Sequence, residues 1–316
     1  MDVSVIIVNY NTISLLVNCI NSIYEKSKGL DLEIIVVDNN SSDDSRQILK
    51  DKFTDVNYLS LPENIGFGRA NNEGVKIAKG RNIFFLNPDT ILLNNAVKIL
   101  SNELDKNSDY GVVGGNLYNE KGRPCHSHMM YFPGILTELN TLSSGIIRRL
   151  FLSKNIEHNY TDSKIEVAYI TGADLMMPKD LFIKLGGFNP LFFMYYEETE
   201  LCFRVKKNGC KIINIPTSKI AHLEGASFSS KISLARFERF HRGREIYNRL
   251  TQSKFKKQIL NIIKILSLYK ELVFSIFKFD TAMFKHQKSK LNIFNKIKRT
   301  DLESLARNII SNDTIQ

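Results

Sequence analysis

The first hundred residues alternate between short apolar runs and stretches of helical composition, and this alternation constrains the fold more than any other feature. The run Val3–Val8 is apolar at nearly every position, which is typical of a strand buried on both faces of a parallel sheet. Strands that alternate with helices form βαβ units, so the pattern predicts a mainly parallel, Rossmann-like sheet. The predicted strands are Val3–Val8, Glu33–Val37, Val56–Leu61 and Asn82–Leu86, and the predicted helices include Gly68–Ala78, closed by Gly80, and Asn94–Leu104.

The regular alternation ends after about residue 105. Residues 110–220 have the composition of short strands, turns and brief helices, and beyond Leu234 the chain is helical and basic. We therefore expect an α/β fold whose main domain spans residues 1–232, in two halves at 1–105 and 106–232, followed by a helical region at 233–316.

Polar residues stand at the carboxyl ends of three predicted strands. Asn9 and Asn11 follow the first strand, Asp38 ends the second, and Asp89 follows the fourth. Open parallel sheets bind ligands at this edge, so the sequence predicts a nucleotide site there. The triplet Asn87-Pro88-Asp89 also has turn composition. A single carboxylate at this edge nevertheless suits Mg²⁺ or Mn²⁺ when substrate phosphates complete the coordination shell.

The segment NIGFGRANNEG, residues 64–74, is close to a dinucleotide-binding fingerprint. It follows the third predicted strand rather than the first, and Asn71 stands where the last glycine is required. We therefore exclude a dinucleotide site. The turn from Asn64 through Gly66 into the helix can still bring backbone N–H groups close to a ligand.

Three carboxylates stand together in the segment FFMYYEETEL, residues 192–201. Glu197, Glu198 and Glu200 open a helix that is expected to end at Gly209. The positive end of the helix dipole is expected to keep them ionised. Helix capping is the simpler explanation of the cluster taken alone. By the helical repeat, Glu198 points about 100° away from the face that Glu197 and Glu200 share.

The net charge of +10 comes from one segment of the chain. Residues 251–300 contain 12 Lys and Arg against only Glu271 and Asp280, so the rest is close to neutral. Within this segment, residues 259–279 are apolar but interrupted by lysines, too charged for a membrane-spanning helix. Two explanations stand equal: a basic amphipathic helix on an anionic membrane surface, or a helical subdomain or homodimer interface with a solvated lysine face.

Cysteine usage and the N-terminal sequence bear on the compartment. The four cysteines lack CxxC spacing, which indicates free thiols and a reducing environment. No basic region followed by an apolar stretch opens the chain, so no signal peptide is expected. We expect a cytoplasmic protein, peripheral on the inner face of the cell membrane. No aromatic stacking motif accompanies the lysines, so nucleic-acid binding is not expected.

Seven segments with the composition of motifs follow one another over roughly residues 3–245: VSVIIVNYN, VVDNNSSDDS, NIGFGRANNEG, FLNPDT, TGADLMMP, FFMYYEETELCFR and IAHLEGAS. In this order they resemble the motifs of family 2 glycosyltransferases with the GT-A fold, and the closest subgroup is the bacterial rhamnosyltransferase-like enzymes. The resemblance implies a mixed, mainly parallel sheet with a nucleotide-binding half at 1–105 and an acceptor and catalytic half at 106–232.

The resemblance also implies roles for single residues. Glu198 matches the second acid of the family's Glu-Asp pair, the general base. Asp89 matches the metal-binding carboxylate of the DxD-type motif, and His222 matches a position near the metal or pyrophosphate. The residues assigned to the nucleotide are Asn9, Asn11, Asp38, Asn64, Gly66 and Asn71. Two departures stand out: Asn87 replaces the first acid of DxD, and Glu198 is one methylene longer than the usual Asp.

The implied activity is a metal-dependent, inverting transfer of rhamnose from dTDP-rhamnose. The implied acceptor is a glycan or lipid-linked glycan of bacterial cell-surface polysaccharide synthesis. One carboxylate is enough to take the proton of the acceptor hydroxyl, because a divalent ion neutralises the leaving diphosphate. UDP-hexoses are the second choice of donor. The rival from another class is a nucleotide-sugar-binding subunit without catalysis, which the departures at Asn87 and Glu198 permit and which donor binding without turnover would reveal.

Overall fold

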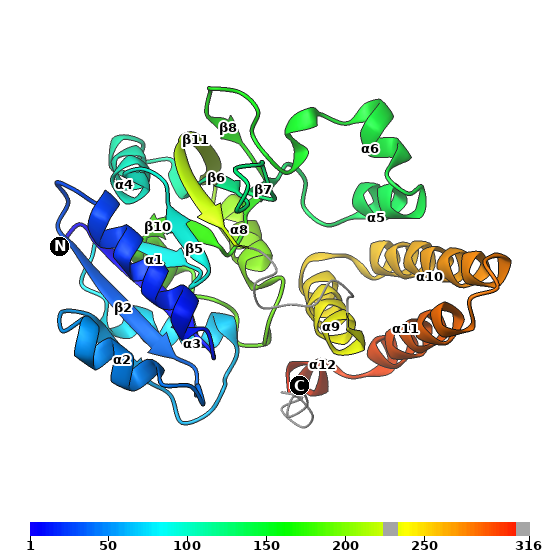
Figure 1. The fold of residues 1–316 in the computed structure, drawn as a ribbon. Coiled ribbons are helices and arrows are strands. Elements are labelled where there is room, and N and C mark those ends of the chain that lie inside the picture. Colours follow the sequence, from blue (N-terminus) through cyan, green and yellow to red (C-terminus); the bar gives the residue numbers. More distant parts are fainter. Residues whose placement is uncertain (224–232, 308–316) are drawn as a thin grey trace.

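The structure is a computed structural model, and it describes residues 1–223 and 233–307 (Figure 1). Its first part has the predicted alternation of strands and helices. The elements are β1 (Val3–Asn9), α1 (Ile13–Lys26), β2 (Leu32–Asp38), α2 (Ser45–Lys52), β3 (Asn57–Ser60), α3 (Phe67–Ile77), β4 (Asn82–Leu86), β5 (Thr90–Leu92) and α4 (Ala96–Lys106). The predicted bounds of β4 are confirmed, whereas α3 begins and ends one residue before its predicted bounds of Gly68 and Ala78.

Strands β3, β2, β1 and β4 lie side by side in that order, and all are parallel. Since β1 has β2 on one side and β4 on the other, the direction of strand addition reverses beside β1. Loops that leave neighbouring strands at such a switch point diverge, and ligands of α/β proteins bind there. The mainly parallel sheet is therefore confirmed, and the loops after β1, β2 and β4 share one edge.

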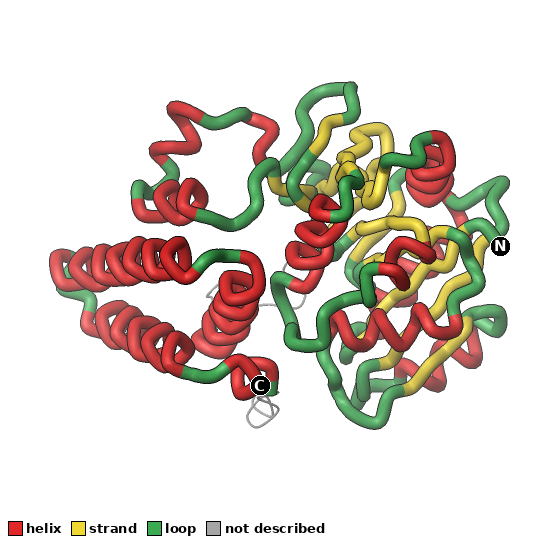
Figure 2. The backbone as a smooth tube through the Cα atoms, turned by 180° about the vertical axis from the view of Figure 1, so that it is seen from behind, coloured by secondary structure: helices red, strands yellow, loops and turns green. Residues whose placement is uncertain are grey.

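Both faces of the parallel strands are covered by helices, which explains the apolar runs (Figure 2). Ile7 packs with residues of α1 and α4, whereas its neighbour Ile6 packs with residues of α3, as expected from the alternation of side chains along a strand. Each such aliphatic side chain contributes about 1.5–3 kcal/mol when it is fully buried.

The second half extends the sheet with mixed pairing. β10 runs antiparallel to β4 and β6, while β11 runs parallel to β6 and antiparallel to β5. The elements are β6 (Tyr110–Tyr118), β7 (His128–Met129), α5 (Ile135–Leu142), α6 (Ile146–Phe151), a 3₁₀ turn (Lys154–Ile156), β8 (Ile165–Glu166), β9 (Tyr169–Ile170), β10 (Asp174–Pro178), α7 (Lys179–Lys184), α8 (Glu197–Lys207) and β11 (Lys211–His222). The short strands expected over residues 110–220 are corrected at β11, which has 12 residues and ends at His222.

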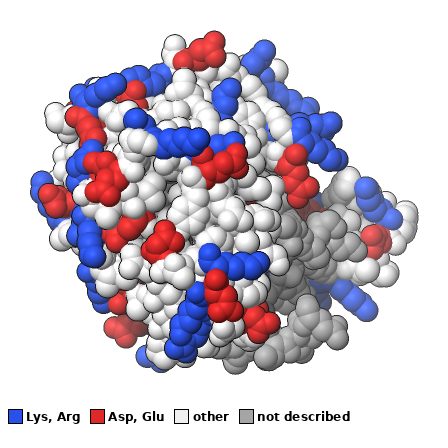
Figure 3. Space-filling model, turned by 60° about the vertical axis from the view of Figure 1, so that its left-hand side comes forward, with Lys and Arg blue, Asp and Glu red and all other residues white. Residues whose placement is uncertain are grey.

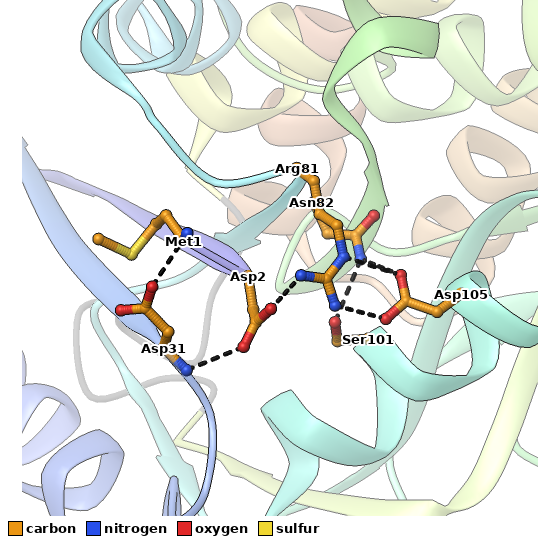
Figure 4. Close-up of polar contacts among 7 residues, drawn as sticks. All are labelled: Met1, Asp2, Asp31, Arg81, Asn82, Ser101 and Asp105. Atoms are coloured by element: carbon orange, nitrogen blue, oxygen red, sulfur yellow. Dashed lines mark hydrogen bonds and ion pairs between the residues drawn. The ribbon is translucent and has the colours of Figure 1, made fainter.

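Ion pairs close the amino edge of the parallel strands, opposite the edge where ligands are expected (Figure 4). Arg81 bridges Asp2 and Asp105, and the amino group of Met1 lies 2.9 Å from Asp31. The pKa of Asp105 is lowered mainly by its hydrogen bond from Arg81. Exposed pairs of this kind contribute little to stability. Because these charged groups are paired with one another, they are not available to bind a ligand at this edge.

Four helices complete the described chain, and each begins after a capping side chain. Ser233, Ser253, Asp280 and Asp301 each accept a hydrogen bond from the backbone N–H three residues later. None of the helices in residues 1–223 and 233–307 is long and apolar enough to cross a membrane. The expected boundary at 232/233 adjoins residues outside the described part. The four helices are α9 (Leu234–Thr251), α10 (Lys254–Phe277), α11 (Thr281–Arg299) and α12 (Leu302–Ala306).

The helical region shares an apolar cluster with the main body. Phe192 and Tyr196, which precede α8, pack with Tyr247 of α9, Ile297 of α11 and Leu305 of α12. Helices α9, α11 and α12 therefore cover side chains of the body that water would otherwise reach.

The charges of the body are mixed, as its neutral composition implies. Figure 3 shows the face on the side of the first half, where Lys and Arg are interspersed with Asp and Glu. The excess of positive charge belongs instead to α10, α11 and their flanks.

Candidate active site

The loops after β1 and β2 are joined by the side chain of Asn9. Its Nδ2 lies 3.0 Å from Asp38 Oδ1, 3.0 Å from Ser41 Oγ and 2.8 Å from Ser45 Oγ, and its Oδ1 accepts from Thr12 Oγ1. Asn9 has 0% exposed surface. Its amide therefore holds Asp38 and the following loop in place and does not face solvent.

Asn11 is the exposed member of this group. Its backbone is left-handed, with φ of 55°, a conformation that Asn tolerates better than most residues. Its Oδ1 accepts a hydrogen bond from the N–H of Ser42 at 2.7 Å. Asn11 and Asn9 thus fasten the two loops at the switch point, one at the surface and one beneath it.

The loop before α3 is clamped onto the segment that precedes α8. Asn64 Oδ1 accepts from the N–H of Gly66 at 3.0 Å, and the N–H of Phe67 donates to the carbonyl of Phe193 at 3.0 Å. Gly66 has φ of 88°, and a Cβ there would lie 2.3 Å from that carbonyl oxygen, so no other residue fits. Asn71 is buried, with its Nδ2 donating to the carbonyl of Phe67.

Pairing between β5 and β11 brings Asp89 and His222 together. The register sets His222 opposite Thr90, and His222 Nε2 lies 3.3 Å from Asp89 Oδ1. Both side chains are mostly buried but reach solvent. The N–H of Leu223 also donates to the Asp89 carbonyl at 2.9 Å.

Asp174 starts β10 at the same edge and is a site residue that was not predicted from the sequence. It is completely buried, and burial raises its pKa well above the usual range. Its Oδ2 accepts from the N–H of Gly115 at 2.6 Å, while Oδ1 has no hydrogen-bond partner in the described residues. The signal was an acid opening an apolar strand, DLMMP.

The three glutamates of α8 lie in different environments. Glu200 pairs with Arg204 at 2.8 Å, and Arg204 also donates to the carbonyls of Leu185 and Gly187. Glu200 is therefore structural. Glu197 is 4% exposed, and its Oε2 has no hydrogen-bond partner in the described part of the chain. Glu198 is partly exposed and accepts from Thr199 Oγ1 at 3.1 Å.

The expectation that the helix dipole keeps these acids ionised is corrected. Burial, followed by repulsion from Glu198, raises the pKa of Glu197 to about 8. Burial also raises the pKa of Glu198. The loss of water around two adjacent carboxyls outweighs the stabilisation that a helix N-terminus supplies.

The TGAD loop, residues 171–174, lies between Glu198 and the loop that carries Asp89. A Cβ on Gly172 would be 4.0 Å from Glu198 Cβ and 3.4 Å from the ring of Phe67. The carbonyl of Ala173 accepts from the N–H of Asn87 at 3.1 Å. The structure thus brings the acid of α8, the glycine loop and the Asn87-Pro88-Asp89 turn to one neighbourhood.

Helix α9 supports the turn that leads into Glu197. Tyr195 and Tyr196 both have left-handed backbones, with φ of 72° and 73°, which costs about 1–3 kcal/mol per residue. Gly243 of α9 packs so closely that a Cβ would lie 2.5 Å from the Tyr195 carbonyl oxygen. The ring of Tyr196 packs on Phe240 and Tyr247.

Comparison with known proteins identifies the fold and the family. The family described as "Glycosyl transferase family 2" matches residues 4–165, about half of the chain. The chain belongs to glycosyl transferase family 2. This confirms the resemblance seen in the motifs, and it shows that the protein is a glycosyltransferase.

Similar proteins of known function and similar solved structures are also glycosyltransferases or have the same fold. It is 26% identical over 283 residues to the dTDP-rhamnosyl transferase RfbF of Shigella flexneri, covering 88% of this chain and 87% of that protein. It is 27% identical to the low-salt glycan biosynthesis hexosyltransferase Agl10 of Haloferax volcanii, covering 67% of this chain but only 64% of Agl10. A crystal structure of GalNAc-T7 with UDP, GalNAc and Mn²⁺ superposes with a TM-score of 0.59 at 15% identity, covering 94% of this chain and 56% of that one.

The residues of this glycosyltransferase fit a divalent ion that is held jointly with a substrate. Asp89 and His222 offer a carboxylate oxygen and an imidazole nitrogen 3.3 Å apart. No group of three or more His, Cys, Asp or Glu in residues 1–223 and 233–307 is arranged to hold a metal by itself. A site with one or two protein ligands is typical where phosphate oxygens supply the rest.

Proposed function

We propose that this glycosyltransferase transfers rhamnose from dTDP-rhamnose to a glycan or lipid-linked glycan during polysaccharide synthesis, with inversion at the anomeric carbon. The observation that carries the proposal is the convergence of Glu198, the TGAD loop and the Asp89–His222 pair at the carboxyl edge of the sheet. The similarity to RfbF along most of both chains supports the donor.

In this proposal Glu198 is the general base. Its pKa is raised by burial, which makes its carboxylate a stronger base toward an acceptor hydroxyl. Thr199 Oγ1 donates to Glu198 Oε1, which holds the carboxylate in one orientation toward the substrate. A raised pKa in Glu197 keeps that neighbour protonated below about pH 8, which leaves one negative charge at the site.

The nucleotide-sugar donor would be held by residues of the loops after β1, β2 and β4 and by His222 at the end of β11. By the motif resemblance, Asp38, which Asn9 positions, and the exposed Asn11 would hold the base and ribose. Asp89 and His222 would hold Mg²⁺ or Mn²⁺ beside the diphosphate. When bound, the ion would neutralise the charge that develops on the leaving diphosphate.

The test measures binding and turnover separately. Purified protein is screened against nucleotide sugars by thermal shift, with and without Mn²⁺, and nucleoside diphosphate release is followed with glycan acceptors. We expect dTDP-rhamnose to stabilise the protein and to turn over. Glu198→Gln should keep donor binding and lose about 10²–10⁴ in rate, while Glu120→Gln, at an exposed acid, should match the wild type.

Two other outcomes would redirect the proposal. Turnover of a UDP-hexose with no response to dTDP-rhamnose would favour a hexosyltransferase, a reading that the similarity to Agl10 supports. Donor binding without release of the nucleoside diphosphate by the wild type would favour a non-catalytic donor-binding subunit, since Asn87 replaces an acid of the family motif.

A further inference from the structure

Helix α10 is apolar on two opposite faces, and only one of them is covered. Its covered face includes Leu260, Ile263 and Leu268. Its exposed face carries Ile262, Leu266, Tyr269, Val273 and Ile276, which are 46–58% exposed. We call these five residues the α10 stripe. Their spacing of four, three, four and three residues makes one continuous line along the helix.

In a helix that meets water, polar residues normally face the solvent, but several polar residues of α10 face the protein interior. Ser267 and Ser275 are buried, and burial lowers the pKa of Lys264, while the α10 stripe faces outward. A helix that is hydrophobic around its circumference normally has partners on all sides. The α10 stripe therefore indicates a surface that is covered when the protein works.

The turn after α10 adds exposed aromatic side chains to this surface, and α6 carries exposed apolar side chains of its own. Phe277 and Phe279 are 76% and 94% exposed, and Asp280 fixes the turn by capping α11. On α6, Leu150 and Phe151 are mostly exposed. Lys270 Nζ donates to the carbonyl of Leu142 and to Ser144 Oγ, which ties the α5–α6 turn to α10 on the side away from the sheet (Figures 1 and 2).

Basic residues stand at both ends of the α10 stripe. Three exposed or half-exposed lysines (Lys254, Lys256 and Lys257) precede it, and three exposed lysines (Lys278, Lys285 and Lys288) follow it. The segment 251–300 contains only two acids. A surface that is apolar in the middle and cationic at both ends is complementary to an anionic bilayer, whose acyl region accepts the stripe and whose headgroups accept the lysines.

A second copy of the chain is a poorer partner for the same surface. In a two-fold symmetric pair whose α10 stripes lie along one another, the helices run close to parallel or antiparallel. Because both ends of α10 are basic, either arrangement places lysines of one copy beside lysines of the other, and like charges in contact oppose association. A nucleic acid would match the lysines but not the aliphatic side chains between them.

We infer that α10 lies in the plane of an anionic lipid bilayer, with the α10 stripe, Phe277 and Phe279 in the outer acyl layer and the flanking lysines at the headgroups. The helix lies on the membrane and does not cross it. This inference deepens the proposed function by naming the surface on which a lipid-linked acceptor is met, and it rests on that function to this extent.

The chain offers a clean optical test because it contains no tryptophan. Leu266→Trp places one indole on the stripe, and Ile183→Trp places one on an exposed site of α7 as the matched control. With vesicles of phosphatidylcholine and phosphatidylglycerol, we expect a blue shift and quenching by brominated acyl chains for the first variant only. Equal responses of the two probes, or none from either, would overturn the inference.

Sedimentation separates the apolar and cationic contributions. The double variant Leu266→Gln, Val273→Gln should bind anionic vesicles at least tenfold more weakly, whereas Ile77→Gln, Ile183→Gln should bind like the wild type. Replacing Lys254, Lys256 and Lys257 by Gln should weaken binding by roughly 100-fold at low salt, about fivefold per lysine. It should have little effect on vesicles of phosphatidylcholine alone.

Light scattering and a donor assay keep the alternatives apart. A wild-type dimer that the stripe variant turns into a monomer, with no vesicle binding by either, would assign the surface to a second copy. Salt-sensitive binding to DNA that the stripe variant keeps, again without vesicle binding, would assign it to nucleic acid. Thermal shift with nucleotide sugars needs no membrane, so a failure of the proposed function would appear there and leave the vesicle result standing.

Discussion

Replacing Glu197 by Gln should change how stability depends on pH. Burial and the neighbouring Glu198 raise the pKa of Glu197 from 4.5 to about 8 in the folded protein. The folded state therefore binds more protons than the unfolded state between these two values. Stability from this group is fully present below about pH 4.5 and is lost as the pH rises toward 8.

The size of the effect follows from the same two pKa values. At about 1.36 kcal/mol per pH unit, ionisation of this carboxyl in the unfolded state lowers the free energy of unfolding by about 3 kcal/mol at most between pH 4.5 and pH 7. Gln resembles the protonated acid in shape and cannot ionise. The variant should therefore lose this dependence and gain stability relative to the wild type as the pH rises.

Urea unfolding at several pH values between 5 and 8 measures the effect. The difference in unfolding free energy between variant and wild type isolates Glu197, because every other titrating group is shared. Glu73→Gln, at a partly exposed acid that pairs with Lys76 at the surface, is the control and should give a nearly flat difference. Parallel pH curves for wild type and Glu197→Gln would refute the argument that this carboxyl is protonated in the fold.

Three further changes have defined outcomes. Asp89→Ala should abolish transfer and remove Mn²⁺-dependent stabilisation by nucleoside diphosphate, and near-normal turnover in chelator would disprove the metal assignment. Gly243→Ala should destabilise the fold by about 1–3 kcal/mol and slow turnover, because its Cβ meets the Tyr195 carbonyl oxygen. Thermal unfolding and rates should be unaffected by Gly134→Ala, which meets only ordinary contacts. Ending the chain after Thr251 should give an insoluble protein, since α11 and α12 cover Phe192, and a soluble, active fragment would contradict this.

Local patterns were sufficient for the parallel half of the fold. The strand Asn82–Leu86 was predicted at its observed bounds, because an apolar run bounded by turn residues has few other solutions. Helix α3 ends at Ile77, one residue before the predicted end at Ala78. Gly80 is needed there for close packing against β1, where a Cβ would lie 2.3 Å from the N of Ser4, and not to end the helix.

What the sequence could not show depends on contacts between distant segments. The raised pKa of Glu197 comes from burial, which no helix-capping rule contains. The role of Asn9 as a buried brace requires Ser41 and Ser45 to fold back onto β1. The left-handed Tyr195 and Tyr196 have no signal of their own, because aromatic residues rarely adopt that conformation unless a neighbour such as α9 enforces it.

The close contact between Gly243 and the Tyr195–Tyr196 turn has a thermodynamic consequence. Helix α9 touches the entrance to the acids of α8, and through Arg244 it also contacts the carbonyl of Leu260 in α10. A ligand that moves the Tyr195–Tyr196 turn must therefore also move α9, and a surface that binds α10 must affect the turn through α9. Coupled binding equilibria are reciprocal. If binding of a surface to α10 raises the affinity of the site for its ligand by some factor, then ligand binding raises the affinity of α10 for that surface by the same factor.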